Sequence, residues 1–185
     1  MAKKKKKLHI CVFCGASNDS PKLFLEMAYK LGKKLAKKNY TLVYGGANNG
    51  CMGAVANGCM ENGGEVIGVF PGILLDKEVA HTGLTKLIIA ENMSARKQKM
   101  YDLSDAFIIL PGGLGTMDEY FEILTLKKLK GHTKPIIIYD FYNYWERLLK
   151  LLVSMVRHGF AGGDVFGLYN VAKTEEEIFD ILKKI

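Results

Sequence analysis

The chain has 185 residues, of which 49% are hydrophobic, and a formal net charge of +7. This length and apolar content suit one domain with a substantial core rather than two domains. The longest apolar runs, such as 136–139, are far too short to span a bilayer, and no apolar segment follows the basic start as a signal peptide requires. These features exclude a membrane protein and lead us to expect a soluble, cytoplasmic one.

The positive charge is concentrated at the N-terminus. Lys3–Lys7 carry five of the seven net charges, so the remainder of the chain carries only +2. A terminal lysine run is usually solvated, and we interpret residues 1–7 as a disordered basic tail before a single domain, 8–185. The alternative is a nucleic-acid-binding arm, whose affinity would fall steeply with salt. The nearly neutral body disfavours that alternative, and no nucleic-acid partner is expected.

Short apolar runs alternate with helical stretches along the chain. Several of the runs are almost continuously apolar, as strands covered on both faces are. Strand and helix alternation with right-handed crossovers predicts an α/β fold, a doubly wound parallel sheet flanked by helices. The expected strands are 8–14, 41–44, 65–70, 86–90, 106–110, 135–139 and a less regular 168–172, and the expected helices are 21–38, 52–62, 95–103, 117–129, 144–158 and 175–184.

Two helix starts have capping signals. Ser20-Pro21 predicts a helix with the serine as N-cap and the proline in the first helical position. Thr174, which three glutamates follow, predicts an N-cap for the last helix.

The four cysteines favour structural thiols over a metal or redox site. Cys11 and Cys14 have CxxC spacing but lie in an apolar run that predicts a buried strand. Cys51 and Cys59 lack a second close pair of cysteines or histidines that would complete a zinc site. No metal is expected.

In parallel sheets of this kind, ligands bind beyond the carboxyl ends of the strands, where the strand order reverses. Four loops meet this condition. They are 14–20, which contains Ser17; 44–53, which contains Gly45 and Gly46; 90–100; and 110–119.

The loop 110–119 has the composition of a phosphate cradle. Glycines let backbone N–H groups approach a ligand, and a helix N-terminus adds unpaired donors and partial positive charge. Gly112, Gly113, Gly115 and Thr116 are the candidates, and Gly45 and Gly46 could form a second wall. The alternative is that these glycines only form tight turns. Neither loop is a Walker P-loop, and the first strand is not followed by GxGxxG, so no dinucleotide or other cofactor is expected.

Charged residues beside these glycines have two interpretations each. Glu119 could act in catalysis, with Glu122 one turn further along the helix, but Thr116 to Glu119 also matches a capping box. Arg96 and Lys97 could bind an anion or could belong to a solvated basic face. A phosphate anchor, a carboxylate and an arginine together suggest cleavage at a glycosidic carbon through an oxocarbenium-like transition state.

The segments "PGGLGTMDE" and, upstream, "MSARK" resemble the PGGxGTxxE and M-x-x-R-K elements of the Lonely Guy family of cytokinin riboside 5′-monophosphate phosphoribohydrolases. The similarity extends from about residue 8 to residue 163. The resemblance implies a Rossmann-like homodimer that hydrolyses N6-modified adenosine 5′-monophosphates to free base and ribose 5-phosphate. Members have often been labelled lysine decarboxylases, but no lysine here is singled out for a Schiff base.

The resemblance also implies roles for individual residues. It makes Arg96 and Glu119 the catalytic pair and the residues Gly112, Gly113, Gly115 and Thr116 the phosphate loop. Further substrate contacts are implied for Glu78, Met93, Lys97 and Thr125. The chain departs from the usual pattern at Ser94, Leu114, Asp118 and 47–49, which leaves the base preference open because Leu114 and the second loop could line the pocket.

A second function stays open at this point, a nucleotide-binding regulatory protein without catalytic activity, because a fold alone does not fix chemistry. That alternative predicts that AMP raises thermal stability while no ribose 5-phosphate is formed.

Overall fold

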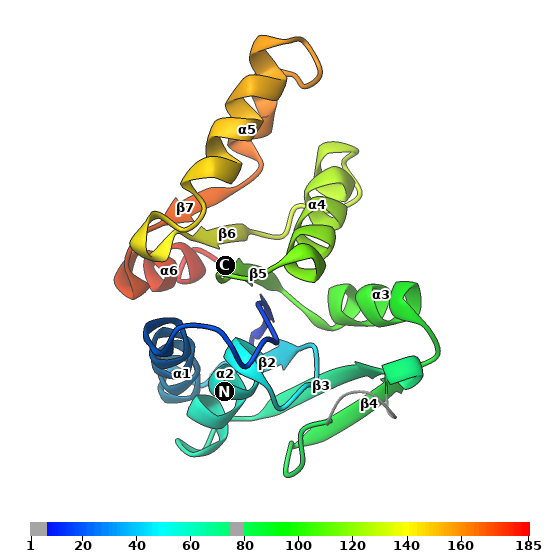
Figure 1. Cartoon of the computed structure of the whole chain (residues 1–185), viewed down its shortest axis with the longest axis vertical. Helices are drawn as coiled ribbons and strands as arrows, with labels where there is room; N and C mark the ends of the chain where they lie inside the picture. Colours follow the sequence, from blue (N-terminus) through cyan, green and yellow to red (C-terminus); the bar gives the residue numbers. More distant parts are fainter. Residues whose placement is uncertain (1–6, 75–79) are drawn as a thin grey trace, which may run out of the picture.

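The computed structural model describes residues 7–74 and 80–185. These residues form one sheet in which every pair of neighbouring strands is parallel (Figure 1). The spatial order is β4-β3-β2-β1-β5-β6-β7. This arrangement confirms the predicted doubly wound α/β fold. The strands are β1 (His9–Phe13), β2 (Thr41–Tyr44), β3 (Val66–Pro71), β4 (Lys86–Ala90), β5 (Ala106–Ile109), β6 (Ile136–Tyr139) and β7 (Asn170–Ala172).

Helices cover both faces of the sheet. Alternate side chains of β1 point to opposite faces, so Ile10 and Val12 pack with α1, α2 and α6, whereas Cys11 and Phe13 pack with α3, α4 and α5. The helices are α1 (Lys22–Lys37), α2 (Gly50–Met60), α3 (Met93–Leu103), α4 (Leu114–Lys128), α5 (Glu146–Arg157) and α6 (Glu175–Leu182), with short 3₁₀ turns at Gly72–Leu74, Phe141–Asn143 and Gly163–Gly167.

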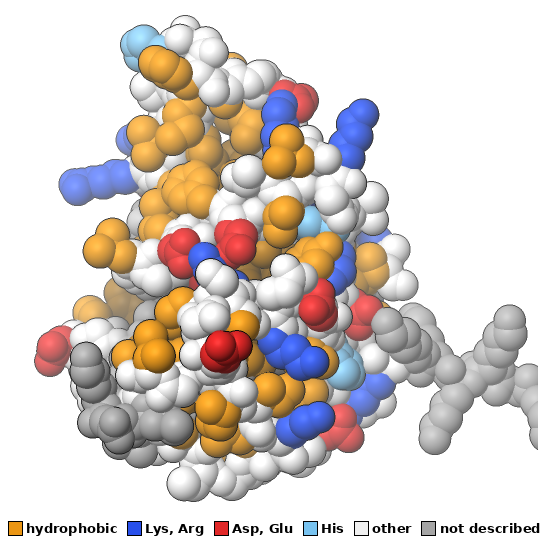
Figure 2. All heavy atoms as spheres, turned by 90° about the vertical axis from the view of Figure 1, so that its right-hand side faces the viewer, with side chains coloured by type: hydrophobic (Ala, Val, Ile, Leu, Met, Phe, Trp, Pro, Cys, Tyr) orange, Lys and Arg blue, Asp and Glu red, His pale blue; other side chains and the backbone are white. Residues whose placement is uncertain are grey.

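Helix α5 extends beyond the sheet (Figure 1). Figure 2 shows hydrophobic side chains gathered on the upper part of the molecule, where α5 and α4 lie. Exposed apolar residues in this region include Leu129, Leu151, Val153, Phe160 and Phe166.

The strand order reverses between β1 and β5. After β1 the chain builds the sheet outward through β2, β3 and β4, and it then returns to place β5 on the other side of β1. The two loops that leave these strands are bonded to each other, since the Gly15 amide donates to the Pro111 carbonyl at 3.1 Å. A crevice at the carboxyl end of the sheet therefore lies between the loops 14–20 and 110–113.

One of the two predicted helix caps is confirmed and the other is wrong. Thr174 caps α6 in a full capping box with Glu177, as predicted. The prediction for Ser20 is wrong, because α1 begins at Lys22 with Pro21 as its N-cap residue and without a side-chain cap. The Ser20 hydroxyl donates instead to the Ser17 carbonyl at 2.9 Å and so stabilises the loop before the helix.

The four cysteines are buried free thiols. Burial raises the pKa of Cys51 and of Cys59 to about 11, so both thiols stay protonated at neutral pH. Cys11 and Cys14 pack on opposite faces of the sheet, which separates the two thiols of the CxxC spacing. In residues 7–74 and 80–185, no three His, Cys, Asp or Glu side chains converge as a metal site would require.

None of the helices within the described ranges has the length and apolar character needed to cross a membrane. Residues 1–6 of the predicted tail lie outside the described ranges, and Lys7 forms an ion pair with Glu65 at 3.0 Å.

Candidate active site

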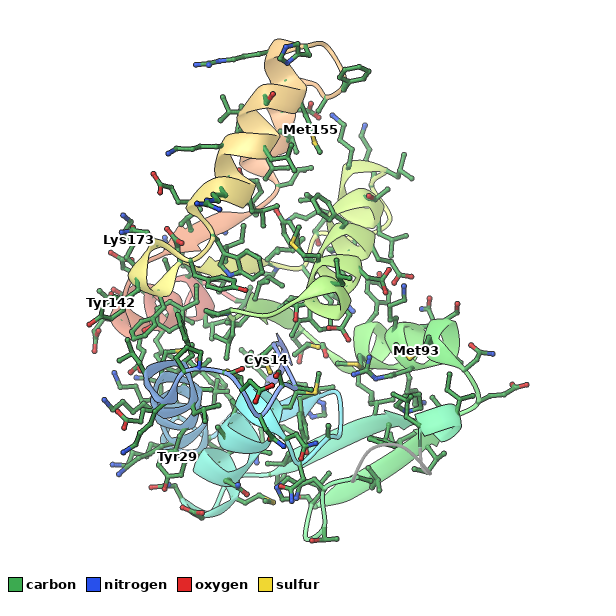
Figure 3. All side chains as sticks on the ribbon, in the orientation of Figure 1. Cys14, Tyr29, Met93, Tyr142, Met155 and Lys173 are labelled. Atoms are coloured by element: carbon green, nitrogen blue, oxygen red, sulfur yellow. The ribbon has the colours of Figure 1, made fainter. Side chains whose placement is uncertain are left out.

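A cavity of about 470 Å³ opens at the carboxyl end of the sheet. Its wall is formed by the loops after β1, β2, β3 and β5, by the starts of α2, α3 and α4, and by the turn between β6 and α5. Figure 3 labels two of the lining residues, Cys14 at the end of β1 and Met93 at the start of α3. The site thus lies where the switch in strand order predicts it.

Arg96 and Glu119 form an ion pair in the wall of this cavity. The distance from Arg96 Nη1 to Glu119 Oε1 is 2.8 Å, and both side chains are buried. Arg96 Nε also donates to the Val69 carbonyl at 3.0 Å, which fixes the guanidinium plane against the end of β3. Two residues 23 positions apart in sequence are thereby brought together, as the resemblance implied.

Burial controls the charge of Glu119. Removal from water raises the pKa of this carboxyl to about 7, although the positive charge of Arg96 acts in the opposite direction. A carboxyl group with this pKa changes its charge near neutral pH, which is the range in which acid and base catalysts work.

The capping-box interpretation of Glu119 is wrong. Helix α4 begins at Leu114, three residues earlier than predicted, and its N-cap is Gly113 without a side-chain cap. Thr116 and Glu119 therefore lie inside the helix, and the carboxylate bonds to Arg96 rather than to a backbone amide at the helix start.

The N-terminus of α4 presents unpaired amides. In the part of the chain that the structure describes, the N–H groups of 113–116 donate to no backbone carbonyl. A methyl group added at Gly113 or Gly115 would meet no atom within 4 Å, so open space lies beside both backbones. Gly112 is different, because a side chain there would overlap the Thr116 hydroxyl. Free amides, the helix dipole and open space are the features with which helix N-termini bind anions.

The two glycines after β2 have separate roles. A side chain at Gly45 would overlap Arg96 Nη2, so this glycine makes room for the guanidinium at the cavity wall. Gly46 has a φ of 82° and its carbonyl accepts from the His81 amide at 2.9 Å. Gly46 is therefore a turn residue, and it is not part of the cavity wall in the described chain.

The structure brings some of the predicted substrate contacts to the cavity and not others. Ser17 and Met93 line it. Lys97 lies outside the wall, with its ammonium 2.9 Å from Asp118 Oδ2 and 2.8 Å from Glu122 Oε2. Thr125 is exposed further along α4.

Two further sequence expectations concern the pocket. Glu78 lies outside the described residues. Leu114 is 90% exposed and does not line the cavity, whereas Ala47 of the second loop does. The base preference could therefore depend on the departure at Ala47, which contacts the cavity, and not on the departure at Leu114.

Sequence reasoning missed an apolar part of the wall. Phe24 of α1, Met52 of α2, Phe70 of β3 and Tyr144 before α5 all line the cavity. Tyr144 could have been found, because it follows β6, the strand beside β5, and its loop therefore opens at the same end of the sheet. Phe24 and Met52 lie on expected helices, where apolar residues indicate core packing rather than a site.

Comparison with known proteins identifies the family. A family profile described as "Possible lysine decarboxylase" matches residues 52–182. A cytokinin riboside 5′-monophosphate phosphoribohydrolase of Rhodococcoides fascians is 40% identical over 152 residues, which cover 82% of this chain and 77% of the relative. The chain belongs to the Lonely Guy family.

Other relatives carry the same name. The cytokinin riboside 5′-monophosphate phosphoribohydrolase of Mycobacterium tuberculosis is 40% identical over 151 residues, which cover 82% of this chain and 80% of the relative. One from Arabidopsis thaliana is 34% identical over 98% of this chain and 84% of its own.

Solved structures share the fold. A molybdenum cofactor binding protein from Rippkaea orientalis has a TM-score of 0.74 at 23% identity, and a molybdenum cofactor carrier protein from Chlamydomonas reinhardtii has a TM-score of 0.74 at 25% identity. Each comparison covers 97% of this chain and 98% of the other. The two likenesses support the Rossmann-like architecture of the Lonely Guy chain.

Proposed function

We propose that this protein hydrolyses the N-glycosidic bond of N6-modified adenosine 5′-monophosphates, with free base and ribose 5-phosphate as products. The observation that carries the proposal is one cavity wall that contains both the buried Arg96–Glu119 pair and the free amides of α4. The amides can then hold the phosphate of a substrate while the carboxylate acts on the sugar of the same molecule. Family members at 34–40% identity bear the name of this activity.

Each part of the site has a role in this reaction. The amides of Gly113, Gly115 and Thr116 bind the 5′-phosphate, and Arg96 orients Glu119 and offsets its charge. When the bond between ribose and base breaks, positive charge develops on the sugar, and the Glu119 carboxylate stabilises it or positions the attacking water.

A lysine decarboxylase activity has less support, despite the description of the family profile. Such an enzyme uses pyridoxal phosphate bound to a lysine. In the described chain no lysine lines the cavity, and the ammonium of Lys97 faces Asp118 and Glu122 outside it. The donor set of this cavity therefore fits a phosphate and a sugar better than a Schiff base.

We further propose that the protein is a homodimer. The exposed apolar side chains of α5 and its surroundings, among them Leu151 and Phe160, offer a surface that a second copy would cover. Sedimentation of the wild-type protein is expected to give the mass of a dimer. The double substitution Leu151→Asp and Phe160→Asp is expected to yield monomers, and a monomeric wild-type protein would overturn the proposal.

The activity is tested by incubating the protein with AMP, isopentenyladenosine 5′-monophosphate, other nucleoside monophosphates and the matching nucleosides. Chromatography then measures free base. Release from 5′-monophosphates and not from nucleosides is expected, because the amides of α4 recognise the phosphate. No release from any of them, with AMP still raising the melting temperature, would instead support the nucleotide-binding protein without catalytic activity.

A further inference from the structure

The turn between β6 and α5 is held rigidly beside the cavity. Asp140 is buried, and its carboxylate accepts from the Trp145 amide at 2.7 Å. Tyr142 and Asn143 have φ values of 54° and 57°, a left-handed conformation that residues with side chains rarely adopt. Lys173 Nζ donates to Asn143 Oδ1 at 3.1 Å, and Figure 3 shows Lys173 and Tyr142 on this side of the molecule. The backbone of 140–145 is therefore fixed from several directions.

This turn directs Tyr144 toward the phosphate loop. The Tyr144 hydroxyl donates to the Gly112 carbonyl at 2.8 Å. Its ring packs edge to face against Phe24, with 5.7 Å between ring centroids, and against Trp145, with 4.8 Å. The ring is thus supported on two sides, and its hydroxyl reaches the loop from a different strand.

The peptide that accepts this hydrogen bond joins two glycines. A peptide between glycines has little intrinsic preference for one orientation, because neither neighbour has a side chain that restricts rotation. In a trans peptide the C=O and N–H groups point in opposite directions, and the described chain contains no cis peptide. A hydrogen bond that holds the Gly112 carbonyl toward Tyr144 therefore turns the Gly113 N–H to the other side.

We propose that Tyr144 is a positioning residue that presents the Gly113 amide to the 5′-phosphate of the substrate. The flipped peptide would direct a carbonyl dipole at the anion in place of an N–H group, so the hydroxyl of Tyr144 keeps the anion site in its binding orientation. The inference rests on the proposed function, because it assigns the phosphate to the α4 amides. It adds a part of the chain, the turn after β6, that none of the sequence motifs contains.

The test compares Tyr144→Phe with Tyr142→Phe. Tyr144→Phe removes only the hydroxyl and keeps the ring contacts with Phe24 and Trp145. Tyr142 lies in the same turn and is 72% exposed, so its substitution is a matched control. Calorimetry measures the dissociation constants of ribose 5-phosphate and of adenosine for each protein, and melting temperatures show that the variants are folded. Steady-state kinetics with AMP separate KM from kcat.

Tyr144→Phe is expected to weaken ribose 5-phosphate binding by about fivefold, the effect of one neutral hydrogen bond. Adenosine binding should stay at the wild-type value, and the melting temperature should fall by no more than about 2–4 °C, the effect of one hydrogen bond. KM for AMP should rise while kcat does not change. The Tyr142→Phe protein should behave as wild type.

Three outcomes would overturn the inference. They are unchanged ribose 5-phosphate binding in Tyr144→Phe, an equal loss of adenosine binding, or no ribose 5-phosphate binding by the wild-type protein. The proposed function fails separately. A wild-type protein that binds ribose 5-phosphate through Tyr144 but cleaves no monophosphate would support the inference and refute the hydrolase activity. Cleavage of AMP with the same KM in Tyr144→Phe would support the hydrolase activity and refute the inference.

Discussion

Arg96 and Glu119 lie 2.8 Å apart in a buried ion pair that joins α3 to α4. The bond from Arg96 to the Val69 carbonyl adds a third element, β3, to the same contact. A buried ion pair contributes little net stability, because the free energy that both ions lose on leaving water offsets most of their attraction. Its position in the cavity wall, rather than a gain in stability, is what makes this pair a catalytic candidate.

The first prediction concerns the pH dependence of activity. Burial raises the pKa of Glu119 to about 7. The carboxylate, and not the protonated acid, stabilises a ribosyl cation, so kcat/KM, which reports the free enzyme, should rise with pH and level off above about 7. A pH profile of AMP cleavage between pH 5 and 9 measures this. A rate that falls through the same range would instead make Glu119 a proton donor.

The same pKa predicts how stability depends on pH. Unfolding lowers the pKa of Glu119 from about 7 to about 4.3, the value for an unstructured glutamate. Between these values the folded state holds a proton that the unfolded state has lost, so the free energy of unfolding falls as pH rises, by at most about 1.4 kcal/mol per pH unit. The effect is present in full below about pH 4.3 and is lost above about pH 7.

Urea unfolding of the wild type and of Glu119→Gln, at several pH values between 5 and 8, isolates this contribution. The stability of the wild type relative to the variant should fall with pH. A difference that rises with pH would mean that Arg96 lowers the pKa of Glu119 more than burial raises it.

The second prediction separates stability from binding at Gly115. A methyl group there meets no protein atom within 4 Å. Since Gly115 lies in the first turn of α4, alanine should stabilise the fold by about 0.4–1 kcal/mol. The same methyl group enters the space that we assign to the phosphate, so KM for AMP should rise at least about tenfold. Thermal melting and kinetics of Gly115→Ala measure both, and an unchanged KM would place the phosphate elsewhere.

The third prediction concerns Gly45, which makes room for Arg96. A methyl group at this position overlaps Arg96 Nη2 and lies 2.8 Å from Met52 Sδ. Met52 Sδ is near the end of a flexible side chain and can give way, whereas the guanidinium is buried and bonded to Val69 and Glu119, so it must move at a cost in stability. Melting temperatures show whether Gly45→Ala is folded. A misplacement of a catalytic group by about 1 Å costs about 10²-fold in kcat/KM. Gly167→Ala, where the added methyl group meets nothing within 4 Å, is the control. Equal activity of the two variants would contradict a role for the exact placement of Arg96.

The fourth prediction tests Lys97, a substrate contact by resemblance. Its ammonium already faces Asp118 and Glu122 outside the cavity wall. Lys97→Met should therefore leave KM for AMP unchanged. Stability should fall, because the Lys97 side chain is only 16% exposed and its loss leaves the carboxylates of Asp118 and Glu122 without this partner. A large rise in KM would show that Lys97 leaves this cluster to contact the substrate.

Much of the fold could be predicted from the sequence. Short, mostly apolar runs such as 41–44 and 86–90 are strands with those bounds. The reversal of strand order then places the loops 14–20 and 110–119 together, as predicted from the fold class alone. The strand order does not by itself bring Arg96 and Glu119 together, because α3 and α4 follow β4 and β5, which β3, β2 and β1 separate in the sheet. The two residues meet because α3 runs back from β4 across the sheet toward β1.

The remaining features depend on tertiary contacts that have no local pattern. The T-x-x-E spacing at Thr116 matches a cap, but α4 extends one turn earlier and Arg96 bonds to Glu119. Lys97 follows Arg96 directly, yet successive helix positions face different directions and Lys97 lies outside the cavity. Tyr144 reaches Gly112 across 32 positions, through a turn whose left-handed residues are not glycines.

The assignment of Glu119 as the carboxylate that acts on the sugar is tested by product release from isopentenyladenosine 5′-monophosphate, measured for the wild type and for Glu119→Gln. The wild type should release base and ribose 5-phosphate in equal amounts. The variant, folded and still able to bind the substrate, should turn over about 10²- to 10⁴-fold more slowly. Turnover by Glu119→Gln at the wild-type rate would contradict the assignment of Glu119 and with it the proposed reaction at this site.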